Sequence, residues 1–152
     1  MTIERRIFVF GAVAAIAGLG IGGWAIAPTR AADIRVFKSP SCGCCNGWID
    51  HLRKNGFSVE VVEQEDVSPI KARLGVPSFL ESCHTASIGN YVIEGHVPAA
   101  DIQRLLELKP EARGLAVPGM PVGSPGMEYE NQRERFEVVL FGERGNFVFA
   151  RY

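Results

Sequence analysis

The sequence IRVFKSPSCGCCNGWIDHL spans residues 34–52 and joins two different hydrophobic patterns. Ile34–Lys38 alternates apolar and polar side chains, which is typical of a β-strand. Further on, Trp48, Ile49 and Leu52 recur at helical spacing, and Ser41 is a suitable N-cap for that helix. The stretch therefore predicts a strand, a loop with three cysteines, and a helix whose first turn carries them.

Further strand and helix signals follow this unit along the chain. The first helix should stop at Asn55-Gly56, and after it we expect a strand at Ser58–Glu65, a short helix from Ser68-Pro69 to Gly75, a hairpin around Ile88-Gly89-Asn90-Tyr91 and a helix from Pro98 to Pro110. The order strand, helix, strand, helix, hairpin, helix is that of thioredoxin-like domains. We therefore predict an α/β (α+β) thioredoxin-like fold with a mixed sheet and helices on both faces.

Residues 1–32 have the pattern of an export signal. Arg5 and Arg6 precede an uncharged apolar run from Ile7 to Ala27, and small residues follow this run. The arrangement fits a twin-arginine-like or a Sec signal. The run is also long enough to span a bilayer, so an uncleaved membrane anchor remains an alternative. In both cases we expect the folded part outside the cytoplasm, in the periplasm.

The remaining chain is expected to form one domain built from two parts. We assign 33–110 to a thioredoxin-like metal-binding core, and 111–152 to a Pro/Gly/Met loop and a C-terminal β-hairpin that completes the same domain. The hairpin strands are expected at Phe136–Phe141 and Asn146–Arg151. A domain of this size buries a core without disulfide cross-links, so the cysteines need another role.

Composition argues against a nucleic-acid partner. The formal net charge is −1, and the chain has no basic run and no interleaving of basic with aromatic residues. An exported compartment is oxidising, and exposed thiols there either pair or bind a metal. The expected partners are therefore metal ions, with membrane contact only if the N-terminal segment is retained.

The 4 cysteines are Cys42, Cys44 and Cys45 in one loop, and Cys83. Disulfides within so dense a triplet are strained, whereas soft Cu(I) ions can be bridged by sulfurs that point in different directions. A single tetrahedral zinc ion fits less well, because adjacent Cys44 and Cys45 cannot easily both face one ion. A helix N-terminus lowers cysteine pKa values and so favours thiolates, while burial raises them. These residues predict a copper site with several ions per chain.

The predicted hairpin adds the fourth cysteine and an imidazole to this site. If Gly89-Asn90 forms a two-residue turn, Cys83 lies opposite His96 with Cβ atoms ~5 Å apart. A pairing shift of one residue would direct His84 toward the metal instead, because strand side chains alternate between faces. We therefore expect Cys83 in the site together with one or two imidazoles, from His96 and His84, and this register favours His96.

A second segment with soft donor atoms is Pro118–Met127, whose proline and glycine content excludes regular structure. Apart from the initiator, it holds every methionine of the chain, Met120 and Met127. Thioethers favour Cu(I), so this loop would complete or cover the metal centre. The alternative is that the methionines fill gaps over the core.

Four ordered motifs resemble one known family. They are Cys42-Gly-Cys-Cys45, Ser82-Cys-His-Thr85, Glu94-Gly-His-Val-Pro98 and Gly119-Met-Pro-Val-Gly-Ser-Pro-Gly-Met127. From Ile34 to Met127 the chain resembles the thioredoxin-like copper proteins called CopG, long catalogued only as a domain of unknown function. The resemblance implies a periplasmic protein of bacterial copper resistance that binds several copper ions through its cysteines and changes their redox state. Other periplasmic copper-resistance proteins would be its partners.

Two function classes remain open from the sequence. The first is copper binding and detoxification, in which a copper oxidoreductase activity is left undecided. The second is thioredoxin-type thiol-disulfide exchange by Cys42 and Cys45, which have the required spacing, although Cys44 between them would promote wrong pairings. Hydrolysis by Cys83 and His84 is disfavoured, because neighbours on a strand point to opposite faces. Asp50-His51 is expected on the solvated face of the first helix.

Overall fold

A computed structural model describes residues 33–152. The predicted export signal, residues 1–32, lies outside the described residues. Within the described part of the chain, every helix is too short or too polar to cross a bilayer.

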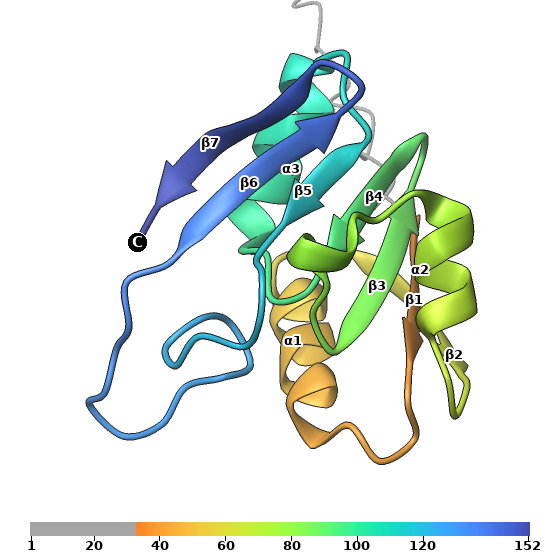
Figure 1. Cartoon of the computed structure of the whole chain (residues 1–152). Coiled ribbons are helices and arrows are strands. Elements are labelled where there is room, and N and C mark those ends of the chain that lie inside the picture. The colour runs from red at the N-terminus through yellow and green to blue at the C-terminus, as the bar shows by residue number, and fades with distance from the viewer. Residues whose placement is uncertain (1–32) are drawn as a thin grey trace, which may run out of the picture.

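The elements follow one another in the predicted order, and additional strands complete the chain (Figure 1). The described residues form β1 (Asp33–Lys38), α1 (Gly43–Lys54), β2 (Ser58–Glu63), α2 (Ser68–Leu74), the 3-10 helix η1 (Ser78–Leu80), β3 (His84–Ile88), β4 (Tyr91–Glu94), α3 (Ala99–Leu108), β5 (Gly114–Ala116), β6 (Glu137–Gly142) and β7 (Gly145–Arg151).

All the strands join one sheet in the order β2-β1-β3-β4-β5-β6-β7. β1 runs parallel to β2 and antiparallel to β3, and β4 runs parallel to β5. In the β3–β4 hairpin Ile88 pairs with Tyr91 and Thr85 with Glu94, which confirms the predicted turn and register. The sheet is therefore mixed, as predicted. The thioredoxin-like assignment itself stays a prediction, with which the order β2-β1-β3-β4 agrees.

Side-chain alternation along the strands gives the sheet two apolar faces. On one face, Ile34 and Val36 of β1 pack in the same core as Trp48 of α1 and residues of α3. On the other face, Val92 of β4 packs with Leu80 of η1. α1 and α3 lie on one side of the sheet and α2 on the other, which confirms helices on both faces (Figure 1). Full burial of a large apolar side chain stabilises the fold by roughly 2–3 kcal/mol.

Two predicted boundaries near the cysteine loop are wrong. The N-cap of α1 is Cys42 rather than Ser41, because the hydroxyl of Ser41 bonds to that of Ser39 and the Cys42 N–H donates to the Ser39 carbonyl. β2 ends at Glu63 rather than at residue 65, since β1, its neighbour in the sheet among residues 33–152, ends at Lys38. Cys44 and Cys45 consequently lie inside the first turn of α1, while Cys42 lies just before it.

His51 is not on a solvated face, contrary to the sequence-based expectation. It is partly buried, and its Nε2 accepts a hydrogen bond of 3.1 Å from the Ala99 N–H at the start of α3. Burial is the main cause that lowers the pKa of His51 below its ordinary value. His51 therefore satisfies an otherwise free N–H of α3 and ties the end of α1 to that helix.

The predicted C-terminal hairpin is confirmed as β6 and β7. β5 was not predicted, yet it is the strand that connects this hairpin to the rest of the sheet. Between β5 and β6, residues 117–136 form no helix or named strand, as the proline and glycine content predicts. This long loop folds back toward α1 (Figure 1).

Candidate metal centre

Two separate segments bring the cysteine sulfurs together. The start of α1 supplies Cys42, Cys44 and Cys45, and the residue just before β3 is Cys83. The Cys44 Sγ lies 3.5 Å from that of Cys42 and 3.8 Å from that of Cys83, and the Cys45 and Cys83 sulfurs are 3.6 Å apart. All four sulfurs lie within 4.8 Å of one another. The predicted convergence of the cysteine loop and Cys83 is therefore present.

Cys42 and Cys45 are joined by a disulfide, with Cα atoms 5.5 Å apart. Cys44 and Cys83 are free thiols. A disulfide sulfur is a much poorer metal ligand than a thiolate, so the complete set of four sulfur donors exists only after this bond is reduced. Reduction takes two electrons and two protons and yields two thiols. The same geometry thus contains a thiol-disulfide couple and a soft metal site.

Both histidines of the hairpin, His84 and His96, approach Cys83. His96 Nε2 lies 3.2 Å and His84 Nδ1 3.3 Å from the Cys83 Sγ. The three ligand atoms form a second group within 4.8 Å, and Cys83 belongs to both groups. Cys83 therefore connects a sulfur-rich side of the site to a nitrogen-containing side.

Both imidazoles reach Cys83 because strand alternation does not extend to these residues. β3 begins at His84, so Cys83 belongs to the preceding loop and need not point away from its neighbour. On the other strand, Gly95 has a φ of 69°, which ends the alternation before His96. The expectation that Cys83 and His84 cannot contact each other is wrong for the same reason.

The hydrogen bond that His96 makes on its far side determines its tautomer. His96 Nδ1 lies 2.8 Å from the Pro125 carbonyl oxygen, which can only accept, so Nδ1 carries the proton. Nε2 then has a free lone pair, and this atom faces Cys83. Burial lowers the pKa of His96 and favours the neutral ring. An imidazole oriented by a carbonyl in this way is the usual arrangement of a metal ligand.

His84 has a different environment, because its ring is completely buried. It packs against the Trp48 ring at a centroid distance of 4.3 Å and against His96 at 4.9 Å. Burial, followed by the nearby His96, lowers the pKa of His84 well below its ordinary value. Nδ1 faces Cys83, and Nε2 has no hydrogen-bond partner. Its Nδ1 can share a hydrogen bond with the Cys83 sulfur or bind a metal there.

Burial dominates the acidity of Cys83. It raises the pKa of the thiol to about 12, and the charge of Cys44 acts in the same direction. The favourable effect of a helix N-terminus, expected from the sequence, does not govern this cysteine, which lies outside α1. Cys83 is therefore a protonated thiol at neutral pH, and a metal that binds it must displace a proton.

The Met-containing loop packs against the start of α1. A Cβ on Gly126 would lie 2.4 Å from the backbone nitrogen of Trp48 and 2.8 Å from the backbone carbonyl oxygen of Cys44. The backbones of the loop and of α1 are therefore in direct contact. Met127 is partly buried, whereas Met120 is 52% exposed and does not fill the core. The loop thus covers the site through its backbone, and a ligand role for the two thioethers stays a prediction.

Two features of the site could not be read from motifs. The Pro125 carbonyl that orients His96 is a backbone group, which any residue type supplies, and only the Pro/Gly content pointed to that loop. Trp48 was predicted to pack in the core. Its indole Nε1–H donates a hydrogen bond of 2.8 Å to the carbonyl oxygen of Val97, the residue that follows His96. One indication of this hydrogen bond was present in the sequence: a buried Trp usually finds an acceptor for its indole N–H.

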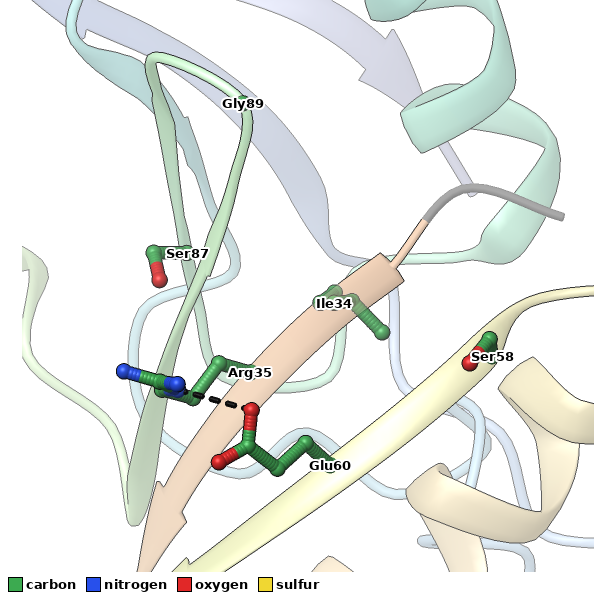
Figure 2. Close-up of a pocket in the computed structure, with 6 residues that line it drawn as sticks. All are labelled: Ile34, Arg35, Ser58, Glu60, Ser87 and Gly89. Carbon is green, nitrogen blue, oxygen red and sulfur yellow. Dashed lines mark hydrogen bonds and ion pairs between the residues drawn. The ribbon is translucent and has the colours of Figure 1, made fainter. Parts of the chain in front are cut away.

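A separate cavity of about 460 Å³ lies on the sheet near the β3–β4 turn (Figure 2). Arg35 and Glu60 form an ion pair of 2.9 Å at its wall. Its remaining lining residues are Ile34, Ser58, Ser87 and Gly89. This lining contains no cysteine, histidine or methionine, so the cavity is not part of the sulfur site.

Comparisons with known proteins agree with this arrangement. The family model described as "Protein of unknown function, DUF411" matches residues 80–127. The solved structure of "Copper resistance protein copG", form 2, is 47% identical, with a TM-score of 0.77, and the match covers 80% of this chain and 98% of that one. Form 1 of the same protein is also 47% identical, with a TM-score of 0.76 and the same coverage. No curated protein matches the chain.

Proposed function

The chain belongs to the family of the copper resistance protein CopG, and from this premise we propose that it is a periplasmic copper-binding protein of copper resistance. It holds several Cu(I) ions in a polynuclear site bridged by the thiolates of Cys42, Cys44, Cys45 and Cys83. The observation that carries the proposal is the convergence of four sulfurs within 4.8 Å. Soft thiolates at this density suit Cu(I), which tolerates bridging sulfur.

The neighbouring imidazoles add nitrogen ligands to the sulfur site. His96 presents a free Nε2 lone pair toward Cys83, and nitrogen ligands suit Cu(II) better than sulfur does. A centre that is sulfur-rich on one side and nitrogen-containing on the other supports interconversion of Cu(I) and Cu(II). The disulfide must first be reduced by a thiol donor of the compartment. The periplasmic location rests on the export pattern of residues 1–32.

Anaerobic metal titration tests the proposal. The fully reduced protein, residues 33–152, is titrated with Cu(I) against a chromogenic chelator, and bound copper and reactive thiols are counted. We expect more than one copper per chain, with all 4 cysteines losing their reactivity as copper binds. Binding of one ion or none, with the thiols still reactive, would contradict the polynuclear site.

The disulfide supports one alternative function, thiol-disulfide exchange by Cys42 and Cys45. This function needs only those two cysteines, whereas the copper site needs all four. In a Cys44→Ser, Cys83→Ser double variant, a thiol-disulfide oxidoreductase would keep its exchange rate with glutathione disulfide. Retained exchange together with absent copper binding in the parent would favour this alternative.

The two histidines should differ in their effect on copper. His96→Ala is expected to remove a nitrogen ligand and weaken copper binding, because His96 has the lone pair and the carbonyl that orients it. His84→Ala should have a milder effect. X-ray absorption of the copper-loaded variants measures the loss of nitrogen scatterers. His51→Ala is the matched control, since His51 bonds to Ala99 and lies outside the ligand groups. The reverse ranking of His84 and His96 would refute this assignment.

The methionines should affect redox balance more than copper content. Thioether is a neutral and comparatively weak ligand that favours Cu(I), so a Met120→Leu, Met127→Leu variant should keep near-normal copper. We expect a lower reduction potential and faster air oxidation, measured by voltammetry and by loss of Cu(I). Leu keeps the approximate volume, which limits any packing change. An unchanged potential and oxidation rate would exclude the thioethers from the site.

A further inference from the structure

A buried ion pair lies on the other side of the sheet from α1. The carboxylate of Glu94, in β4, accepts a hydrogen bond of 2.5 Å from the Lys71 ammonium of α2. Glu94 is 0% and Lys71 3% exposed. The same oxygen, Oε1, accepts the backbone N–H of Ser82 at 2.7 Å. The pair thus joins α2 and β4 to the residue that directly precedes Cys83.

This pair is not arranged for stability alone. Removing two charges from water costs several kcal/mol each, and apolar side chains of similar volume are often equally good. The second carboxylate oxygen, Glu94 Oε2, has no hydrogen bond of good geometry. Burial raises the pKa of the Glu94 carboxyl, and the hydroxyl of its strand partner Thr85 is close enough to lower this pKa in part. The specific result of the arrangement is the position of Ser82.

The position of Ser82 determines that of Cys83. Cys83 lies outside β3, so the regular ladder does not hold it. Ser82 is held from two directions, because its N–H donates to Glu94 and its hydroxyl donates to the Gly119 carbonyl. Gly95 permits this approach, since a Cβ there would lie 2.6 Å from that of Ser82. Cys83 in turn contacts Cys44, Cys45 and both histidines, the most connected sulfur of the site.

We propose that Glu94, oriented by Lys71, is a positioning residue of the copper site: by accepting the Ser82 N–H, it sets the place of the Cys83 sulfur against Cys44 and His96. The inference rests on the proposed copper function and deepens it. The role requires a hydrogen-bond acceptor at this point rather than a charge, and this requirement separates it from a purely structural ion pair.

Two neutral double variants test this requirement. Lys71→Met with Glu94→Gln removes both charges and keeps an amide oxygen for Ser82. Lys71→Met with Glu94→Leu also removes the acceptor. We expect the first to bind Cu(I) as the parent does, and the second to lose as much copper as Cys83→Ser. Adding Cys83→Ser to the second variant should cause no additional loss. A parent-like copper count in a folded Glu94→Leu variant, or an additive loss with Cys83→Ser, would overturn the proposal.

Glu94→Asp covers the case in which the leucine variant does not fold. It keeps the charge next to Lys71 and withdraws the acceptor from Ser82 by one methylene, so it should show the same copper loss. If circular dichroism shows Glu94→Asp folded and its copper count unchanged, the proposal is wrong. Failure of both variants to fold would assign the pair a structural role, and that result also overturns the proposal.

A copper-free readout separates this inference from the proposed function. In a Cys42→Ser, Cys45→Ser background, diamide takes two electrons and two protons from Cys44 and Cys83 and leaves a disulfide between them. The rate of disulfide formation depends on how often the two sulfurs, which lie 3.8 Å apart in the structure, approach to bonding distance. Loss of the acceptor should slow this step about tenfold, as expected when a buried N–H loses its hydrogen-bond acceptor, whereas Glu94→Gln with Lys71→Met should not slow it. Equal rates would refute positioning even if the parent binds no copper.

Discussion

Replacing Cys44 with serine is expected to remove more than one equivalent of copper from the reduced protein. The Cys44 sulfur stands between those of Cys42 and Cys83, at 3.5 Å and 3.8 Å. In the proposed polynuclear site this sulfur bridges two ions, so its loss removes a ligand from each of them. Serine has nearly the same shape, but its neutral hydroxyl is a hard oxygen donor that does not replace thiolate for Cu(I).

The measurement is copper per chain after anaerobic loading, combined with thiol counting. Ser41→Ala is the control, because Ser41 is exposed in the same loop and bonds only to Ser39. Its copper content should equal that of the parent. If Cys44→Ser loses one equivalent or less, and the remaining copper keeps the sulfur coordination of the parent, the ions do not share this thiolate and the polynuclear proposal fails.

Local sequence patterns predicted the elements that carry the site. The alternation of Ile34–Lys38 gave β1, and the spacing of Trp48, Ile49 and Leu52 gave α1. Gly89-Asn90 placed a two-residue turn, and the pairing counted outward from it holds as far as Thr85 and Glu94. Cys83 and His96 lie just beyond this ladder and are in contact, at 3.2 Å. These predictions succeed because each depends on a periodicity or a turn residue with a single local meaning.

The sequence was less informative where tertiary contacts override a local rule. Alternation excluded contact between Cys83 and His84, but the strand begins one residue too late for that rule to apply. The short β5 has only three residues, too few to show a period, and its place is set by its neighbours β4 and β6. No local pattern around Lys71 or Glu94 indicates that these two residues meet in the interior.

The approach of the Met-containing loop to α1 gives a further prediction, because it depends on a residue without a side chain. Gly126 has a φ of 84°, and a Cβ there would lie 2.4 Å from the backbone nitrogen of Trp48 and 2.9 Å from the carbonyl carbon of Gly47. Those atoms are backbone of α1 and cannot move aside without distorting its first two turns. Gly126→Ala must therefore either distort the cysteine-bearing turn or lift the loop from it.

Gly119→Ala provides a matched control in the same loop. Gly119 has a φ of 68°, but a Cβ there would meet no atom within 4 Å. Its substitution should therefore cause only the backbone strain of a left-handed residue, about 1–2 kcal/mol. The difference between the two variants isolates the steric contact with α1 from the conformational preference that both glycines share.

Gly126→Ala is expected to destabilise the protein by roughly 3 kcal/mol or more, since overpacking against rigid backbone adds to the same strain. It should also change the metal site, because Pro125 precedes Gly126 and its carbonyl holds His96 Nδ1 at 2.8 Å. When the loop lifts, His96 loses the group that orients its Nε2, and copper-loaded protein should lose a nitrogen scatterer in X-ray absorption, as in His96→Ala. Thermal denaturation measures the stability of both variants. If Gly126→Ala unfolds at the same temperature as Gly119→Ala and keeps the nitrogen ligand, the loop does not hold His96 in place, and the imidazole is positioned by the hairpin alone.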